Sequence, residues 1–131
     1  MKKNLLTVAL AAVLGVTSLS ALAETWAIDP SHSTVGFAVR HMMVSNVKGA
    51  FGKFTANVDG SPADPATAKI SATIEVASVD TRDPKRDEHL RAADFFDAAK
   101  FPRMTFTSTK VEKTSATTAK LSGDLTLRGV S

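Results

Sequence analysis

The 131-residue sequence predicts an all-β fold, with antiparallel strands that close into a barrel or fold as a sandwich and with one short helical insertion. About six short segments alternate apolar residues with other residues, which is the period-two pattern of strands. Residues 81–100 follow a helical period instead, and the strand–helix–strand rhythm of a parallel sheet does not recur. Since there is no internal repeat or low-complexity linker, these elements predict one domain.

The first 23 residues are predicted to be a signal peptide rather than part of the domain. Lys2 and Lys3 precede an apolar run over residues 5–16, and the segment ends with the small-x-small residues 21–23, Ala-Leu-Ala. The run is shorter than the roughly 20 apolar residues that a membrane span needs. We therefore expect export to the periplasm, cleavage, and a domain over residues 24–131 without stable membrane insertion; the alternative is an uncleaved anchor.

Charge and cysteine content exclude several classes of function. The sequence has 16 basic and 13 acidic residues, so loss of Lys2 and Lys3 leaves a net charge of only +1. Basic clusters interleaved with aromatic residues are missing, which argues against a nucleic-acid partner. The absence of cysteine excludes disulfides, thiolate chemistry and cysteine-based zinc sites. A hydrophobic core alone must therefore hold the domain together.

The first half of the domain contains three predicted strands. Residues 26–28 begin the alternation and lead into an Asp-Pro-Ser turn. Residues 33–40 form the clearest strand, with apolar side chains on one face and mostly small residues on the other. Residues 47–58 continue the pattern but carry Gly49 and Gly52, which we interpret as a bulge or a barrel corner.

The second half contains the helical insertion between two groups of strands. A loop over residues 59–65 precedes an alternating strand over residues 70–79. The pair Asp83-Pro84 is typical of an N-cap followed by the first residue of a helix. Further strands are predicted from residue 104 to residue 108 and over residues 121–127, where the sequence runs out of a strand pattern without a polar tail.

Three stretches carry a family resemblance. The first is WAIDPSHSTVGFAVRHMMVSNVKGAF, residues 26–51. The second comprises VDTR, RDEHLR, DFFD, FP and TFTS between residues 79 and 108, and the third is GDLTLRGV, residues 123–130. In this order and spacing they closely resemble the YceI-like family of periplasmic polyisoprenoid-binding proteins.

The resemblance implies a lipocalin-like antiparallel β-barrel with an elongated apolar cavity along its axis. It also implies a carrier or store of isoprenoid lipids. Family members continue for several strands beyond the motif LTLRGVS at residues 125–131, so we expect the C-terminal strands of the barrel to be missing and the chain to be a fragment or a truncated product. Open sheet edges favour association, and a homodimer is one possible result.

A long prenyl chain has few groups that form hydrogen bonds, so its recognition must come from buried apolar area. In a barrel, alternate residues of each strand point inward. A register error of one residue would reverse the assignment, and the alternative interpretation is that these side chains fill a solid core. The predicted cavity residues are the regular apolar positions Phe37, Val39, Phe54, Val58, Ile74, Val76, Phe106, Leu125 and Leu127.

Cationic and histidine side chains in the family-matching stretches are candidates for binding a phosphate, phenol or quinone head group. The alternative is structural: Arg86 and Asp87 would cap and solubilise a surface helix, and His41 would be a histidine of the protein framework. The head-group candidates are Arg40, His41, Arg82, Arg86 and His89.

Metal binding and catalysis have little support in the sequence. His32, His41 and His89 are the only histidines, and no two have the short spacing of a zinc site. Asp29 with His32 is also compatible with an ordinary turn closed by side-chain caps. The serines lack a Gly-x-Ser-x-Gly elbow. The sequence thus predicts a non-enzymatic lipid carrier without metal or cofactor; the alternative is an envelope stress or structural protein whose solid core supports a protein-binding surface.

Overall fold

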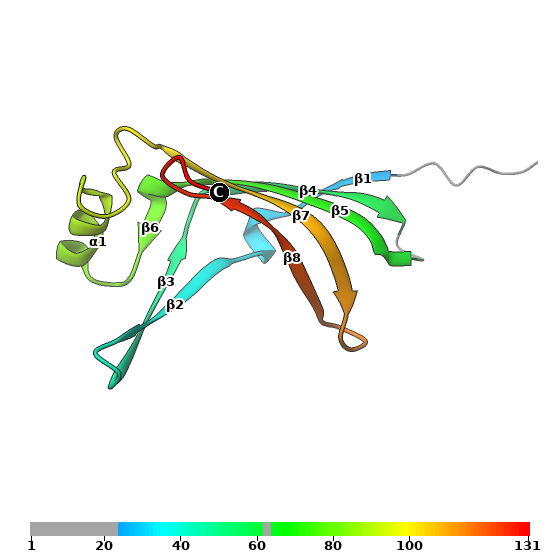
Figure 1. Cartoon of the computed structure of the whole chain (residues 1–131), viewed down its shortest axis with the longest axis horizontal. Helices are drawn as coiled ribbons and strands as arrows, with labels where there is room; N and C mark the ends of the chain where they lie inside the picture. The colour runs from blue at the N-terminus through cyan, green and yellow to red at the C-terminus, as the bar shows by residue number, and fades with distance from the viewer. Residues whose placement is uncertain (1–23, 62–63) are drawn as a thin grey trace, which may run out of the picture.

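The computed structural model describes residues 24–61 and 64–131, and the predicted signal peptide over residues 1–23 lies outside this range. The chain forms two antiparallel sheets, one of five strands and one of three, which meet beside the single helix (Figure 1). The predicted all-β architecture with one helical insertion is confirmed.

The larger sheet is curved. Register shifts between Asp59 and Ser61 and between Ser108 and Lys110 mark irregularities that bend its strands. Figure 1 shows the last two strands curling away from the plane of the others, which gives the sheet a concave face. In order across the sheet, its strands are β1 (Glu24–Ala27), β4 (Phe54–Ser61), β5 (Asp64–Glu75), β7 (Arg103–Lys113) and β8 (Ala119–Thr126).

The smaller sheet is mostly one long hairpin, which we call the arm (residues 35–51). It consists of β2 (Val35–His41) and β3 (Ser45–Phe51), which pair along their whole length. The short β6 (Val79–Asp80) pairs with Ala50 and Phe51 at the base of β3. The outer part of the arm projects away from the rest of the molecule (Figure 1).

The chain passes from the smaller to the larger sheet at Gly52, which confirms the predicted corner there. The N–H of Gly52 donates to the carbonyl of Ser78 (3.0 Å), and the N–H of Lys53 donates to Ser78 Oγ (3.0 Å). Gly49 instead lies within the regular β2–β3 pairing. The same contacts end β5 at Glu75, short of the predicted residue 79. A 3-10 turn, η2 (Val76–Ser78), follows because Ser78 Oγ donates back to the carbonyl of Glu75 (2.6 Å).

The helix α1 (Pro84–Arg91) begins as predicted. Asp83 is its N-cap and accepts from the N–H groups of Lys85 and Arg86, with Pro84 at the first position. The buried core lies where the two sheets and η2 meet, and Leu90 of α1 packs against it. Its members are Phe51, Ile74, Val76, Val79 and Met104, each 1–6% exposed.

The barrel is open. The larger sheet ends at β1 and β8 and the smaller at β2 and β6, and within residues 24–61 and 64–131 no strand pairing joins the two sheets' edges. None of the described helices is long and apolar enough to cross a membrane.

Candidate ligand-binding groove

An apolar groove of about 660 Å³ lies between the arm and the concave face of the larger sheet. Helix α1 and the turns that follow it contribute one end. Every residue of the lining is apolar, and five of the fourteen are phenylalanines. The lining consists of Val35, Gly36, Phe37, Val39, Phe51, Ala72, Ile74, Leu90, Phe95, Phe96, Met104, Phe106, Leu125 and Leu127.

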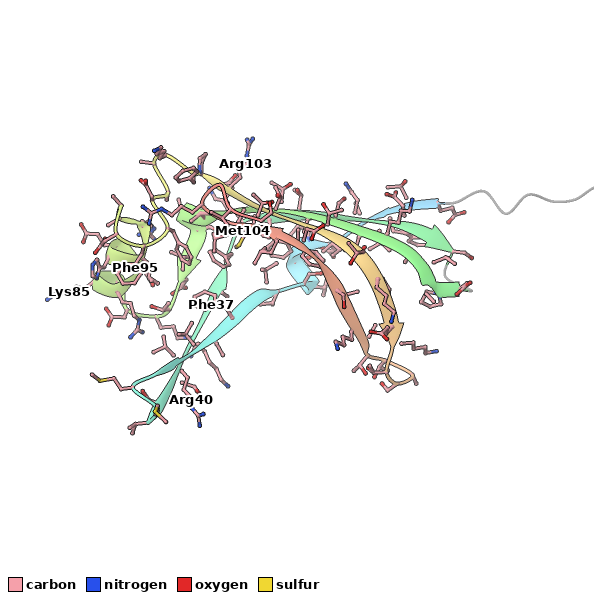
Figure 2. All side chains as sticks on the ribbon, in the orientation of Figure 1. Phe37, Arg40, Lys85, Phe95, Arg103 and Met104 are labelled. Carbon is pink, nitrogen blue, oxygen red and sulfur yellow. The ribbon has the colours of Figure 1, made fainter. Side chains whose placement is uncertain are left out.

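Strand register explains why these side chains converge. Phe106 pairs with Ala72 on one side and with Leu125 on the other, and residues paired across strands share a face. Figure 2 shows Met104 and Arg103 on opposite faces of β7, with Phe37 directed from the arm toward the face that carries Met104. The arm and the sheet therefore present their apolar faces to each other.

Three aromatic rings connect the arm to the helical end of the groove. The ring centroids of Phe37 and Phe51 are 5.4 Å apart, and those of Phe51 and Phe96 are 6.0 Å apart. Gly49, which pairs with Phe37, leaves room for this arrangement, since a Cβ atom there would lie 2.4 Å from Phe37 Cζ. Gly49 is therefore explained by the close approach of an aromatic ring rather than by a bulge.

Six of the nine predicted cavity residues line this groove: Phe37, Val39, Ile74, Phe106, Leu125 and Leu127. Val76 lies in the buried core at 1% exposure. Phe54 pairs with Ile74 and packs against the same core, and Val58 lines a separate apolar hollow beside Trp26. Strand periodicity thus predicted residues on both walls of the groove, the arm and the larger sheet.

The other eight lining residues were not among the predicted ones. Five of them lie on predicted strands, and three of these five are in phase with a predicted residue: Val35 precedes Phe37 by two positions, Ala72 precedes Ile74, and Met104 precedes Phe106. The same alternation, extended by one step, would have found them. Phe95 and Phe96 come from the turns after α1, and no local period indicates that they reach the sheet.

Comparison with known proteins now gives the family. The model of the YceI-like domain matches residues 26–131. The chain belongs to the YceI-like family. It is 42% identical to Protein YceI of Salmonella newport over 132 residues, which cover 99% of this chain and 68% of the relative. Protein YceI of Salmonella arizonae matches with the same identity and coverage.

Solved structures of the family share the fold. BcnA of Burkholderia cenocepacia matches with a TM-score of 0.67 and 34% identity, over 78% of this chain and 64% of that protein. The YceI protein of Campylobacter jejuni matches with a TM-score of 0.60 and 45% identity, over 79% of this chain and 60% of that protein. The chain thus spans less than two thirds of these structures. The predicted lipocalin-like antiparallel fold, with an incomplete barrel, is confirmed.

Among the polar candidates of this YceI-like chain, Arg86 is engaged in a structural contact. Its Nε donates to Thr81 Oγ1 (2.8 Å), and its Nη2 donates to the carbonyl of Thr81 (3.0 Å). Asp87, 7% exposed, accepts from the N–H and from the hydroxyl of Thr81 (2.8 and 2.6 Å). These hydrogen bonds hold the pKa of Asp87 below its usual value. Arg86 and Asp87 thus fasten α1 to the strand before it.

His89 lies beside the groove. Its ring forms a T-shaped contact with the ring of Phe95 at a centroid distance of 4.7 Å, and its Nε2 is 2.6 Å from Asp94 Oδ2. This hydrogen bond is the main cause that lowers the pKa of Asp94. Arg128, which the sequence did not single out, donates to the carbonyl of Phe95 (2.8 Å). His89, Asp94 and Arg128 therefore place polar groups at the helical end of the groove.

The remaining candidates are not gathered there. Arg40 lies near the outer end of the arm and points away from the groove (Figure 2). Arg82 is exposed, with a φ of 62°, and its N–H donates to Asp80 Oδ1 (2.7 Å). The side chain of His41 lies outside the described part of the chain. Among the four candidates whose side chains the structure describes, His89 is therefore the one placed against a residue of the groove, Phe95.

Asp29, Ser31 and His32 form a turn closed by side-chain caps. This is the ordinary turn that the sequence offered as the alternative to a metal site. Asp29 caps η1 (Pro30–His32) by accepting from the N–H and hydroxyl of Ser31. Asp29 and Ser31 both contact Nδ1 of His32, at 2.6 and 3.2 Å, whereas a catalytic triad uses the two ring nitrogens separately. Across residues 24–61 and 64–131, no three potential metal ligands come together.

Proposed function

We propose that this protein is a non-enzymatic binding or carrier protein of the periplasm that holds an isoprenoid-type lipid in the groove. The wholly apolar lining carries the proposal. A groove of about 660 Å³ falls within the usual range of ligand sites, and its fourteen lining residues offer burial but no side-chain hydrogen bond. Such a site favours a ligand that is itself almost entirely hydrocarbon.

The energetics suit a long flexible chain. Each buried methylene contributes about 0.8 kcal/mol, so burial of ten contributes about 8 kcal/mol. That exceeds the lower estimates of the cost of association, which start near ~4 kcal/mol. The five phenylalanines of the lining contribute large apolar surfaces on which a prenyl chain can pack.

The helical end of the groove is the best position for a polar head group. His89 and Arg128 can each donate a hydrogen bond to a phosphate or quinone oxygen there, and charge assistance strengthens such bonds. Both already have a protein partner, Asp94 and the carbonyl of Phe95, which would hold them in place. His89 is the one head-group candidate from the sequence that this proposal keeps.

The direct test is to purify the chain from the periplasm without detergent, extract it with organic solvent and analyse the extract by mass spectrometry. We expect a stoichiometric prenyl lipid. An empty extract from well-folded protein would contradict the proposal and favour the alternative, an envelope stress or structural protein that binds a protein partner.

Two leucines of β8 provide a matched pair of variants. Leu125 lines the groove and is 46% exposed, whereas Leu121 is 43% exposed on the same strand and lies outside the lining. The substitution L125E should remove most of the lipid from the extract, because it places a charge against the bound chain. L121E should retain the lipid. If both variants retained the lipid equally, the lipid would bind somewhere other than this groove.

A further inference from the structure

The turn at the end of the arm exposes three consecutive apolar side chains. Met42, Met43 and Val44, which we call the tip, are 80%, 85% and 90% exposed. The φ angles of Met42 and Met43 are 50° and 59°, so both residues adopt the left-handed conformation that reverses the chain between β2 and β3. The tip projects away from the core on a hairpin whose outer part has no strand on either side among the described residues.

The charges around the tip have one sign. Register places Arg40 opposite Asn46 and Lys48 opposite Ala38, so both cations share the face of the arm that points away from the groove. No acidic residue occurs anywhere between residues 30 and 58. The arm therefore combines an uncompensated positive face with an apolar end.

The opposite face of the arm is apolar from the pair Val39 and Val47 to the groove, and the pair His41 and Ser45 lies between these valines and the tip. Val39 pairs with Val47, and Phe37 follows two residues further in, beside Gly49. Val39 is 56% exposed and lines the groove together with Phe37. An apolar surface thus leads from Val39 and Val47 into the groove.

We propose that the tip docks the protein on a phospholipid bilayer that carries anionic head groups. Met42, Met43 and Val44 enter the region between head groups and acyl chains, while Arg40 and Lys48 contact lipid phosphates. A narrow projecting turn offers little area to a protein partner, but it can be inserted into lipid. The docked arm would place the open end of the groove against the membrane, which is where an apolar ligand is loaded or released.

Flotation with vesicles tests the docking. The chain, as recovered after export, is mixed at low salt with vesicles of phosphatidylethanolamine and phosphatidylglycerol (3:1) or with vesicles of phosphatidylcholine alone. We expect flotation with the anionic vesicles that weakens as salt is added. The variant M42S/M43S/V44S should lower the partition coefficient at least about tenfold, since three apolar side chains lose their insertion. R40Q/K48Q should lower it about fivefold per charge, on anionic vesicles only.

The matched control is L121S/V130S, which removes exposed apolar side chains (43% and 70% exposed) away from the arm. It should float like the unsubstituted protein. All proteins compared share the same N-terminal residues, so differences report the substituted positions. Circular dichroism should show unchanged folding of the tip variant, because its three side chains are almost fully exposed.

A second readout uses the absence of cysteine from the sequence. M43C labelled with an environment-sensitive dye should shift to shorter emission wavelength on anionic vesicles, and V130C should not. The proposal is overturned if the unsubstituted protein does not float, if the tip variant floats equally well, or if the tip variant only dissociates a dimer. Lipid content of the purified protein is measured separately, so failure of the docking and failure of the carrier function are distinguishable.

Discussion

The two ends of the smaller sheet differ in how they are supported. At the base, Val76 and Val79 are each 1% exposed, and Thr81 is 5% exposed within a set of hydrogen bonds to Arg86 and Asp87. At the outer end, β2 pairs only with β3 within the described residues, and the turn between them is almost fully exposed. The base is where stability is concentrated, whereas the outer arm is free to serve binding. Matched substitutions at the two ends test this division.

The largest contrast is expected between two valines. V79A removes two methyl groups from a fully buried side chain and should lower the free energy of unfolding by about 2 kcal/mol, with a cavity adding to the lost burial. V39A, at a position 56% exposed on the arm, should change it by less than about 0.5 kcal/mol. Urea denaturation followed by circular dichroism measures both values. Equal losses would show that the arm and the base share one core.

Two arginines give the next contrast. R86A removes both hydrogen bonds to Thr81 and leaves the buried carbonyl of Thr81 without this donor, so we expect a loss of about 1–2 kcal/mol. R40A removes an exposed charge on the arm, and its effect on unfolding should stay within about 0.5 kcal/mol. If R86A were as stable as the unsubstituted chain but lost its lipid, Arg86 would be a head-group ligand after all.

The same division determines what the sequence could predict. Period-two alternation found β2, β5 and β7 because the apolar residues of each strand share one face, and Asp83-Pro84 located the start of α1 because capping depends on adjacent residues. Both signals are local. The resemblance to the YceI-like family supplied the type of barrel, which periodicity alone did not distinguish from a sandwich.

The parts that were missed depend on contacts between distant segments. Val76 is in phase with Ile74, yet it lies in the core because the chain turns at Ser78 to meet Gly52. Phe96 lines the groove and contacts Phe51, a residue 45 positions earlier in the chain. Arg86 resembles a surface helix residue in sequence, and only its contacts with Thr81 show that it is structural.

Two glycines of the arm give a smaller, more specific contrast. In G49A the new Cβ would lie within 2.4 Å of the Phe37 ring, so the ring must move into or away from the groove. We expect affinity for an apolar fluorescent probe to fall severalfold. G36A meets its nearest neighbour, the carbonyl oxygen of Gly49, at 3.5 Å and should bind the probe normally. A crystal structure of G49A with Phe37 unmoved would contradict this explanation of Gly49.

The smallest effect is expected in acid, and it concerns Asp87 at the base. Its bonds to Thr81 lower the pKa of the folded protein below the usual 3.8, so the unfolded chain binds protons first as the pH falls. The stabilisation is therefore complete above about pH 4 and is lost as the pH drops through the lowered pKa. D87N should be less stable than the unsubstituted chain at pH 7, but it should lose less stability between pH 5 and pH 2.5.

D94N is the matched control for this acid effect. The pKa of Asp94 is lowered by His89, yet both side chains are 60% exposed, so solvent screens the interaction and reduces its contribution to stability. The urea midpoint of unfolding should therefore depend less on pH in D87N than in D94N across the acid range. The opposite ranking would mean that the contact between His89 and Asp94 at the groove end, and not the buried contact between Thr81 and Asp87, controls unfolding in acid. The groove end would then stabilise the fold as well as bind the ligand.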